Sequence, residues 1–155
     1  ISAAGAVTSG AEVTLPGGNR TGASAVLYSP DDSTTRIVLI AGYTAIASAQ
    51  NYIFSSVSGT PTLANAVYYL DFPFTAPAAW VQTSSLNQSL AFGSAVIIDS
   101  TVYHFGGTTS HISGVQSSVY SLNLDTMPAT ATGSWDNRTA MPVGRIGHAA
   151  VTLYQ

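Results

Sequence analysis

The sequence contains no cysteine and no lysine, and only 7% of its 155 residues are charged. Without cysteine there is no disulfide framework, no thiolate metal site and no cysteine nucleophile. The four basic residues are all arginines: Arg20, Arg36, Arg138 and Arg145. Because phosphate binding needs a clustered basic face, we do not expect nucleic acid as a partner. The net charge of -3 is also too small to imply electrostatic steering of a partner.

Long apolar runs are missing as well, and no stretch approaches the roughly 20 residues of a membrane span. The sequence starts at Ile1 without Met or a signal-peptide pattern, which we interpret as a processed or excised piece of something longer. Ser, Thr, Ala and Gly fill the surface positions that Lys and Glu take in a cytosolic protein. We therefore expect an extracellular or cell-surface location.

Three tripeptides fit the acceptor pattern for N-glycosylation, and they begin at Asn19, Asn87 and Asn137. In a secreted eukaryotic protein these asparagines are expected to carry glycans. The alternative interpretation is that they are ordinary polar residues of loops.

Apolar and aromatic residues alternate in short stretches that turn residues separate, which is typical of β-strands. One group of four strands is predicted at 22–28, 36–42, 65–71 and 79–83. A second group is predicted at 93–98, 101–107, 118–124 and 134–136. A weak strand is predicted before them at 7–15, and another begins at 145–151. The continuous apolar run at 36–42 indicates a strand buried on both faces.

The two groups share an order of motifs: Arg-x-Gly, an aromatic-rich strand ending in Gly-Gly, Val-Tyr-x-Leu and a lone Trp. This order resembles the kelch repeat from Arg20 onward, and the second group matches best. The first group has Ala41-Gly42 in place of the double glycine, and the second lacks the leading arginine. Spacings of about 71 and about 54 residues between successive units compare with a period near 50 for kelch.

The resemblance implies an all-β fold, a fragment of a kelch-like β-propeller with four-stranded antiparallel blades. Its expected parts are a strand of a preceding blade at 7–15, blades at 20–86 and 90–142, and the start of a third at 143–155. Two blades cannot close a ring of roughly four to eight. The expected partners are therefore the remaining blades of the same chain or other copies of it. The motif residues are expected to have structural roles: Arg20, Gly22, Trp80, Gly93, Gly106, Gly107, Trp135, Arg145, Gly147 and His148.

Catalysis has little support in the sequence, and we expect no metal and no cofactor. His104, His111 and His148 lack the close spacing of a compact metal motif. No Gly-x-Ser-x-Gly elbow precedes a helix. Copper-radical oxidases such as galactose oxidase also carry kelch-like blades. A resemblance to them would imply a copper centre of tyrosines and histidines, with one tyrosine crosslinked to a cysteine. An oxidase of that type would need a cysteine outside these residues.

Binding is the favoured function, because family members often use one face of the ring to hold partners. On that face we expect the connections 43–64, 108–116, 16–20 and 86–90. The side chains predicted to bind a protein or glycan ligand are Tyr43, Tyr52, Phe54, His111 and Gln116. The leading hypothesis is a non-catalytic extracellular binding module. The alternatives are a structural subunit of an extracellular assembly or filament, and a fragment of a secreted copper-radical oxidase.

Overall fold

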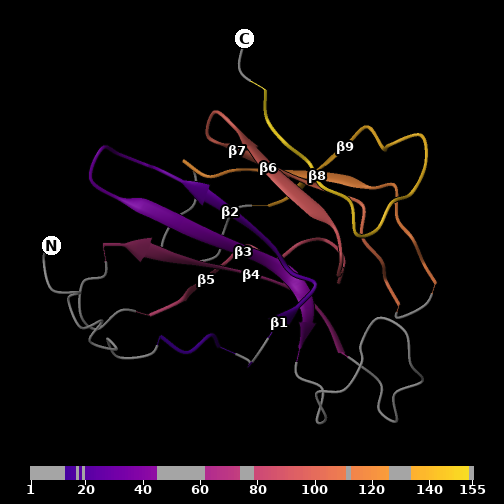
Figure 1. Cartoon of the computed structure of the whole chain (residues 1–155), viewed down its shortest axis with the longest axis horizontal. Helices are drawn as coiled ribbons and strands as arrows, with labels where there is room; N and C mark the ends of the chain where they lie inside the picture. Colours follow the sequence, from indigo (N-terminus) through magenta and orange to yellow (C-terminus); the bar gives the residue numbers. More distant parts are fainter. Residues whose placement is uncertain are drawn as a thin grey trace, which may run out of the picture.

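A computed structural model describes residues 13–16, 18, 20–44, 62–73, 79–110, 113–125 and 134–153. Within these ranges every regular element is a β-strand, as Figure 1 shows. The all-β prediction is therefore confirmed. The described part also holds no helix that is long and apolar enough to cross a membrane.

The first sheet has four main strands that follow one another in space as they do in the chain. These are β2 (Ser24–Tyr28), β3 (Thr35–Thr44), β4 (Thr62–Phe72) and β5 (Val81–Thr83), and each neighbouring pair is antiparallel. A short strand, β1 (Arg20–Thr21), pairs with the last two residues of β3. The first sheet is thus a meander with one additional edge segment.

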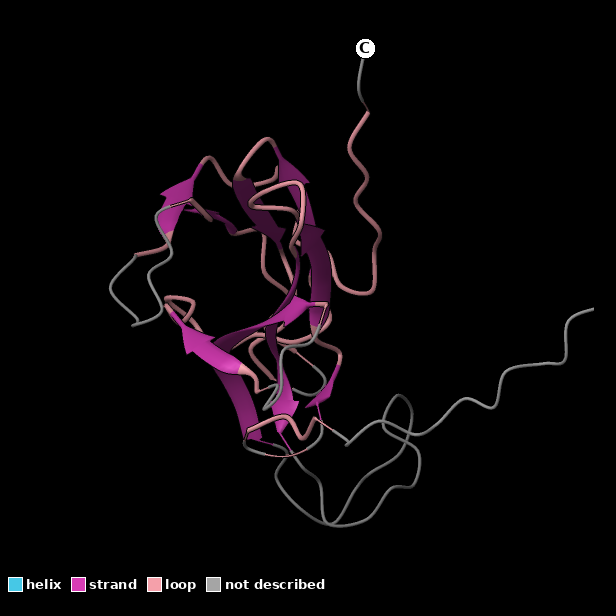
Figure 2. Cartoon of the chain, turned by 90° about the vertical axis from the view of Figure 1, so that its left-hand side faces the viewer, coloured by secondary structure: helices cyan, strands magenta, loops and turns pink. Residues whose placement is uncertain are grey.

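The second sheet repeats this order. Its strands are β6 (Ser94–Ile98), β7 (Thr101–Phe105), β8 (Val119–Asn123) and β9 (Asp136–Arg138), all antiparallel to their neighbours. Asp99 takes a positive φ of 52° in the two-residue turn between β6 and β7. Asp and Asn tolerate this left-handed conformation better than most residues. Figure 2 shows the strands of both sheets from the side.

The eight strands predicted in the two groups are all present, with ends that differ by a few residues. The largest shifts are at β4, which begins at Thr62, and at β9, which continues to Arg138. The predicted strand at 7–15 lies mostly outside the described residues. No strand is formed at 145–151, where one was predicted: the backbone of Arg145 and Gly147 is hydrogen-bonded to the connections 106–118 and 84–93 instead.

The hydrophobic core lies between the two sheets, and alternate residues of each strand point into it. Val38, Ile40 and Val67 come from the first sheet and are completely buried. Val102 and Leu122 meet them from the second sheet. In the run at 36–42, which was predicted to be buried on both faces, residues 38 and 40–42 are buried, whereas Arg36, Ile37 and Leu39 are half-buried.

The two sheets also share an unusual backbone conformation at the end of their second strands. Ala41 and Gly42 have φ values of 59° and 98°, and Gly106 and Gly107 have the same two values. In each sheet the N–H of the second residue donates to a carbonyl in the connection that follows the sheet: Gly42 to Leu90 at 2.8 Å, and Gly107 to Arg145 at 2.9 Å. Leu90 therefore takes the place after the first sheet that Arg145 takes after the second.

A second repeated position corrects the sequence-based alignment. Gly22 and Gly147 have φ values of 68° and 60°, and the residue that matches them is Phe92, with φ of 57°. The N–H of Phe92 donates to the Gly22 carbonyl at 2.7 Å, and the N–H of Gly147 donates to the Phe92 carbonyl at 2.8 Å. Gly93 lies one residue too far along. It must be small for another reason: a Cβ there would lie 2.4 Å from His104 Cε1.

Candidate functional site

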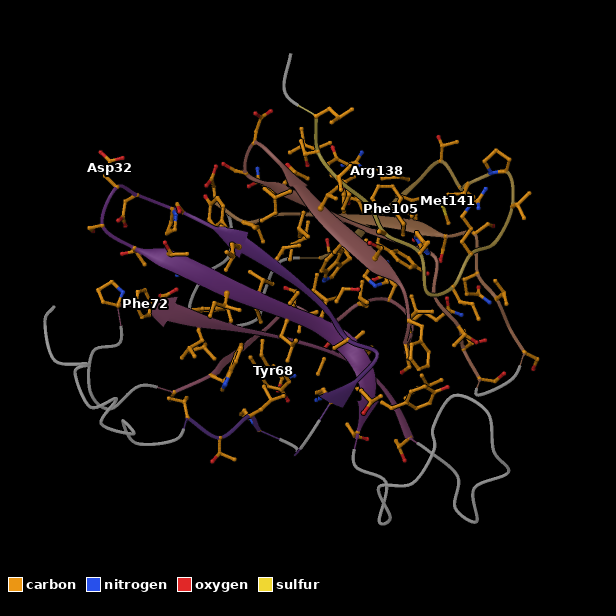
Figure 3. The ribbon with its side chains drawn as sticks, in the orientation of Figure 1. Asp32, Tyr68, Phe72, Phe105, Arg138 and Met141 are labelled. Carbon is orange, nitrogen blue, oxygen red and sulfur yellow. The ribbon has the colours of Figure 1, made fainter. Side chains whose placement is uncertain are left out.

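The candidate site is one end of the two sheets, which we call the loop end. It is formed by the connections 84–93, 106–118 and 139–148 as far as they are described. The opposite end, which we call the hairpin end, carries the tight turns between β2 and β3 and between β6 and β7. In Figure 3, Asp32 and Phe72 mark the hairpin end, and Phe105 and Met141 mark the loop end.

Backbone hydrogen bonds hold the loop end together. Ala91 and Thr108 exchange both of their backbone bonds, at 3.1 and 2.8 Å. The N–H of Gln116 donates to the Gly107 carbonyl at 2.8 Å, and the N–H of Arg145 donates to the Gln116 carbonyl at 3.1 Å. Three separate connections are thereby joined into one hydrogen-bonded surface.

Side chains fix the connection between β7 and β8 further. The Thr108 hydroxyl lies 2.6 Å from the carbonyl oxygens of both Ser110 and Ser113. Gln116, which the sequence predicted to contact a ligand, donates its side-chain amide to the Gly114 carbonyl at 2.6 Å. Because its N–H group is used within the loop, Gln116 has a structural role as well as a place on this surface.

Tyr43 differs most from its predicted role. It belongs to β3, not to a loop, and is only 3% exposed. Burial raises the pKa of its hydroxyl, which has no hydrogen-bond partner among the described residues. Its ring lies 5.8 Å from that of Phe92, a half-buried residue that the sequence analysis did not select. The only sequence signal for Phe92 is its place two residues after Leu90, where the other units have glycine.

Four other predicted residues lie outside the described ranges: Tyr52, Phe54, His111 and Asn19. The remaining two glycosylation candidates are exposed neighbours. The side-chain amide of Asn87 donates to the Trp135 carbonyl at 2.9 Å and lies 3.5 Å from Asn137 Oδ1.

The tryptophans and arginines of the predicted motif differ in how deeply they are buried. Trp135 is buried, and its indole N–H donates to the Ser84 carbonyl at 2.9 Å, while Trp80 is half-buried. The guanidinium of Arg20 lies 5.5 Å from the ring centroid of Tyr68, and its Nε and Nη1 atoms are buried without a hydrogen bond. Arg145 is exposed instead.

His148 lies close enough to His104 to affect the pKa of that ring. Burial, followed by repulsion from His148, lowers the pKa of His104 to about 4. Its Nδ1 atom and both ring nitrogens of His148 are buried without hydrogen bonds among the described residues. In that part of the chain, no three His, Asp or Glu side chains are grouped so that they could hold a metal ion.

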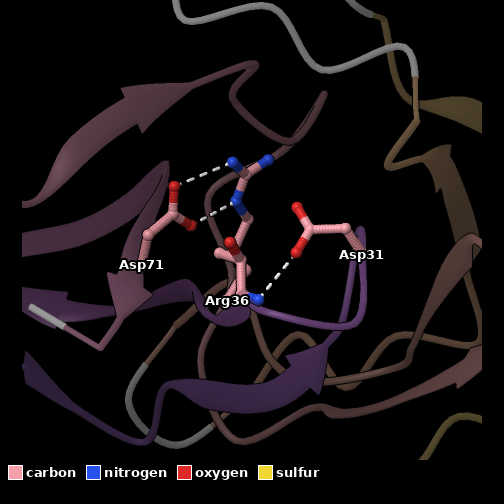
Figure 4. Close-up of polar contacts among 4 residues, drawn as sticks. Asp31, Arg36 and Asp71 are labelled. Carbon is pink, nitrogen blue, oxygen red and sulfur yellow. Dashed lines mark hydrogen bonds and ion pairs between the residues drawn. The ribbon is translucent and has the colours of Figure 1, made fainter.

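The charges are divided between the two ends. At the hairpin end, Arg36 makes a two-pronged ion pair with Asp71, at 2.7 and 3.0 Å, as Figure 4 shows. Among the described residues, five carboxylates lie at this end against that one arginine, so the hairpin end is acidic. They are Asp31, Asp32, Asp71, Asp99 and Asp125.

The loop end has the opposite sign in the described part of the chain. Arg145 lies there, and Arg20 of β1 is at the same end of the first sheet; neither forms an ion pair among the described residues. Arg138 is on the same side of the second sheet, but Asp136 forms an ion pair with it at 3.2 Å. The loop end is therefore weakly basic although the chain as a whole is acidic.

Comparisons with known proteins place the fold but no function. No protein-family model matches the chain, and no curated protein matches it. A solved structure described as the structure of YjhT matches with a TM-score of 0.56 and 18% sequence identity. The match covers 92% of this chain and 33% of that one, so the chain spans about a third of the length of the structure it resembles.

Proposed function

We propose that the two sheets are consecutive blades of a kelch-like β-propeller, and that this propeller is a non-catalytic extracellular module for binding protein or carbohydrate. One observation carries the proposal: the backbone bonds that join the first sheet to the second recur where the chain leaves the second. Around the first sheet, the N–H groups of Leu86, Leu90, Gly42 and Phe92 donate to the carbonyls of Asn65, Ala64, Leu90 and Gly22, respectively. The matching bonds at the second sheet run, in the same order, from Met141, Arg145, Gly107 and Gly147 to Ser117, Gln116, Arg145 and Phe92.

This recurrence supports a third blade that begins at Gly147. Val151 and Leu153 are 76% and 86% exposed. Their counterparts in the first sheet, Val26 and Tyr28, pack against the core. A repeat buries its apolar face only against a neighbour, so further blades of the same chain, or other copies of it, would cover these residues.

The loop end supports binding, because recognition residues are commonly placed on loops that a rigid scaffold holds. Its connections are fixed by backbone and side-chain hydrogen bonds, as described above. Its exposed groups include an apolar side chain, Val115, and a guanidinium without a described acidic partner, Arg145. A surface of this kind can hold a ligand without rearranging.

Arrays of immobilised glycans and peptides, probed with the native protein, test the binding function directly. We expect saturable binding. Thr108→Val should weaken it by loosening the loop, whereas Asp32→Asn at the hairpin end should leave it unchanged. Absence of saturable binding to either array would contradict the proposal. The intact mass before and after enzymatic removal of N-glycans tests the extracellular, glycosylated origin, because an unchanged mass argues against occupied sequons.

A structural role in an extracellular assembly is the second candidate, and the open apolar edges favour it. Leu27 of the first sheet is 67% exposed, and Val151 and Leu153 are exposed beyond the second sheet. Interfaces that join the two edges head to tail would generate rings or filaments. Electron microscopy of the native material distinguishes this candidate, which predicts ordered polymers and no soluble ligand.

A further inference from the structure

We propose that the side chain of Phe92, at the loop end, is a stacking platform for a neutral pyranose ring with equatorial hydroxyls. The proposal rests on the proposed function, because it names the class of ligand and one contact residue of the same binding surface. It draws on the costly backbone conformation of Phe92, on the neighbours that hold its ring, and on the uncharged groups beside it.

Phe92 carries a large side chain in a conformation that favours glycine. Its φ of 57° is left-handed, and the two residues hydrogen-bonded to its backbone, Gly22 and Gly147, have φ values of 68° and 60°. A bulky residue in this conformation is an outlier that costs stability. Strain of this kind clusters at sites where ligands bind. The strain at Phe92 therefore points to a function for its ring.

Residues of the first sheet and its leading segment hold this ring in place. A Cβ at Gly22 would lie 2.8 Å from the ring, so glycine leaves the room that the ring occupies. The ring of Tyr43 packs against it with a centroid distance of 5.8 Å, and Tyr43 is itself only 3% exposed. Tyr43 thus supports the phenyl ring from the interior, while Phe92 remains half-buried. A ring fixed in this way loses little side-chain entropy when a ligand covers it.

The exposure of the Phe92 ring does not depend on which blades follow. The N–H of Phe92 donates to the Gly22 carbonyl just as the N–H of Gly147 donates to the Phe92 carbonyl. A side chain at position 147 would therefore lie against Phe92 as the Phe92 ring lies against Gly22. Because position 147 is glycine, the next unit supplies no such cover.

The groups beside the ring are uncharged. Thr21 is the direct cross-strand partner of Tyr43 in the β1–β3 pair, so the two side chains share one face, and Thr21 is exposed. The guanidinium of Arg20 lies against the Tyr68 ring instead. An aromatic face beside an exposed hydroxyl suits a pyranose, whose C–H groups pack on the ring while its hydroxyls form hydrogen bonds. Equatorial hydroxyls leave those C–H faces flat.

A peptide ligand fits this site less well than a sugar does. The centre of a protein interface is an apolar patch built from several side chains. In the described parts of the first sheet and of the connection 84–93, the strongly exposed large hydrophobic residues are Leu27 and Phe72, both toward the hairpin end. On this side Phe92 is therefore an aromatic ring without an apolar patch around it, which favours a sugar.

Saturation-transfer difference NMR with methyl β-cellotetraoside, a neutral tetrasaccharide whose hydroxyls are all equatorial, tests the proposal. We expect the full 155-residue chain to bind it saturably, with the strongest transfer to the ring C–H protons. Phe92→Gly should weaken binding by about fivefold or more while the chain stays folded, because glycine suits this backbone. Phe92→Tyr keeps an aromatic ring and should bind within about twofold of the original. Phe72→Ala is the matched control, since it removes an exposed phenyl ring at the hairpin end and should leave binding unchanged.

Each result decides a specific point. Phe92→Leu keeps the strained backbone and an apolar side chain without an aromatic face, so it should weaken binding as much as Phe92→Gly does; full binding by either variant refutes the platform. Absence of saturation transfer to the tetrasaccharide, or an equal loss in Phe72→Ala, also overturns the proposal, and saturable binding to an array would still leave the binding module intact. Failure of every glycan and peptide on the arrays removes the proposed function itself. Circular dichroism of every variant verifies that the sheets are retained.

Discussion

Phe92 provides the sharpest test of the backbone geometry, because it shares a left-handed conformation with Gly22 and Gly147, to which it is hydrogen-bonded. A residue with a Cβ costs roughly 1–2 kcal/mol in that conformation. Glycine avoids this cost but loses about 0.5–1 kcal/mol of chain entropy on folding. Phe92→Gly and Phe92→Ala both remove the ring, so comparing them isolates the backbone. We expect Gly to be more stable than Ala here by about 0.5–1 kcal/mol, the reverse of their order in an ordinary strand.

The loss of the ring itself is estimated from its burial. Full burial of a phenylalanine contributes about 1.5–3 kcal/mol, and Phe92 is only half-buried, so removing its ring costs roughly 1–1.5 kcal/mol. Relief of the strain offsets most of this loss in Phe92→Gly. That variant should therefore stay within about 1 kcal/mol of the original protein. Phe92→Ala keeps the strain and should bear the full loss.

Urea denaturation measures the effect as a change in the midpoint at a constant m-value. Gly147→Ala and Gly22→Ala are matched controls for the same position in the other units. Nothing lies within 4 Å of a Cβ at Gly147, while one at Gly22 would lie 2.8 Å from the Phe92 ring. Gly22→Ala should therefore cost more, and the excess should disappear in a Phe92→Ala background. If alanine at position 92 proves as stable as glycine, the left-handed geometry and the alignment built on it are refuted.

Three further predictions concern the core and the hairpin end. The pKa of His104 is lowered to about 4, so the folded protein holds the ring neutral while the unfolded chain protonates it below about pH 6.5. The free energy of unfolding should therefore fall by about 3 kcal/mol as the pH is lowered from 6.5 toward 4. His104→Leu should flatten that part of the stability profile, and an unchanged profile would contradict the burial argument. Trp135→Ala should destabilise by about 3–5 kcal/mol, measured by thermal unfolding, and by clearly more than Trp80→Ala; equal losses would argue against the observed difference in burial. A double-mutant cycle of Arg36→Gln and Asp71→Asn should give a coupling of about 1 kcal/mol that salt reduces, and zero coupling would remove the ion pair as a stabilising contact.

The strands could be predicted because their signals are local. Alternation of apolar and polar residues, the turns at Asp31-Asp32 and Asp99-Ser100, and the paired tryptophans locate both groups of four strands within a few residues. The double glycine of the second group likewise indicated how its second strand ends, and Ala41-Gly42 adopts the same backbone. No long-range information is needed for these features.

Other features were decided only by the packing of the two sheets. Phe92 adopts the left-handed conformation because its N–H and carbonyl bridge Gly22 and Gly147, residues about 70 and 55 positions away in the sequence. Tyr43 is buried because β3 continues past the glycine to pair with β1 and β4. Gly93 is required by the ring of His104. Strand periodicity is encoded in neighbouring residues, whereas these roles depend on contacts between distant segments, and so does the separation of acidic and basic ends.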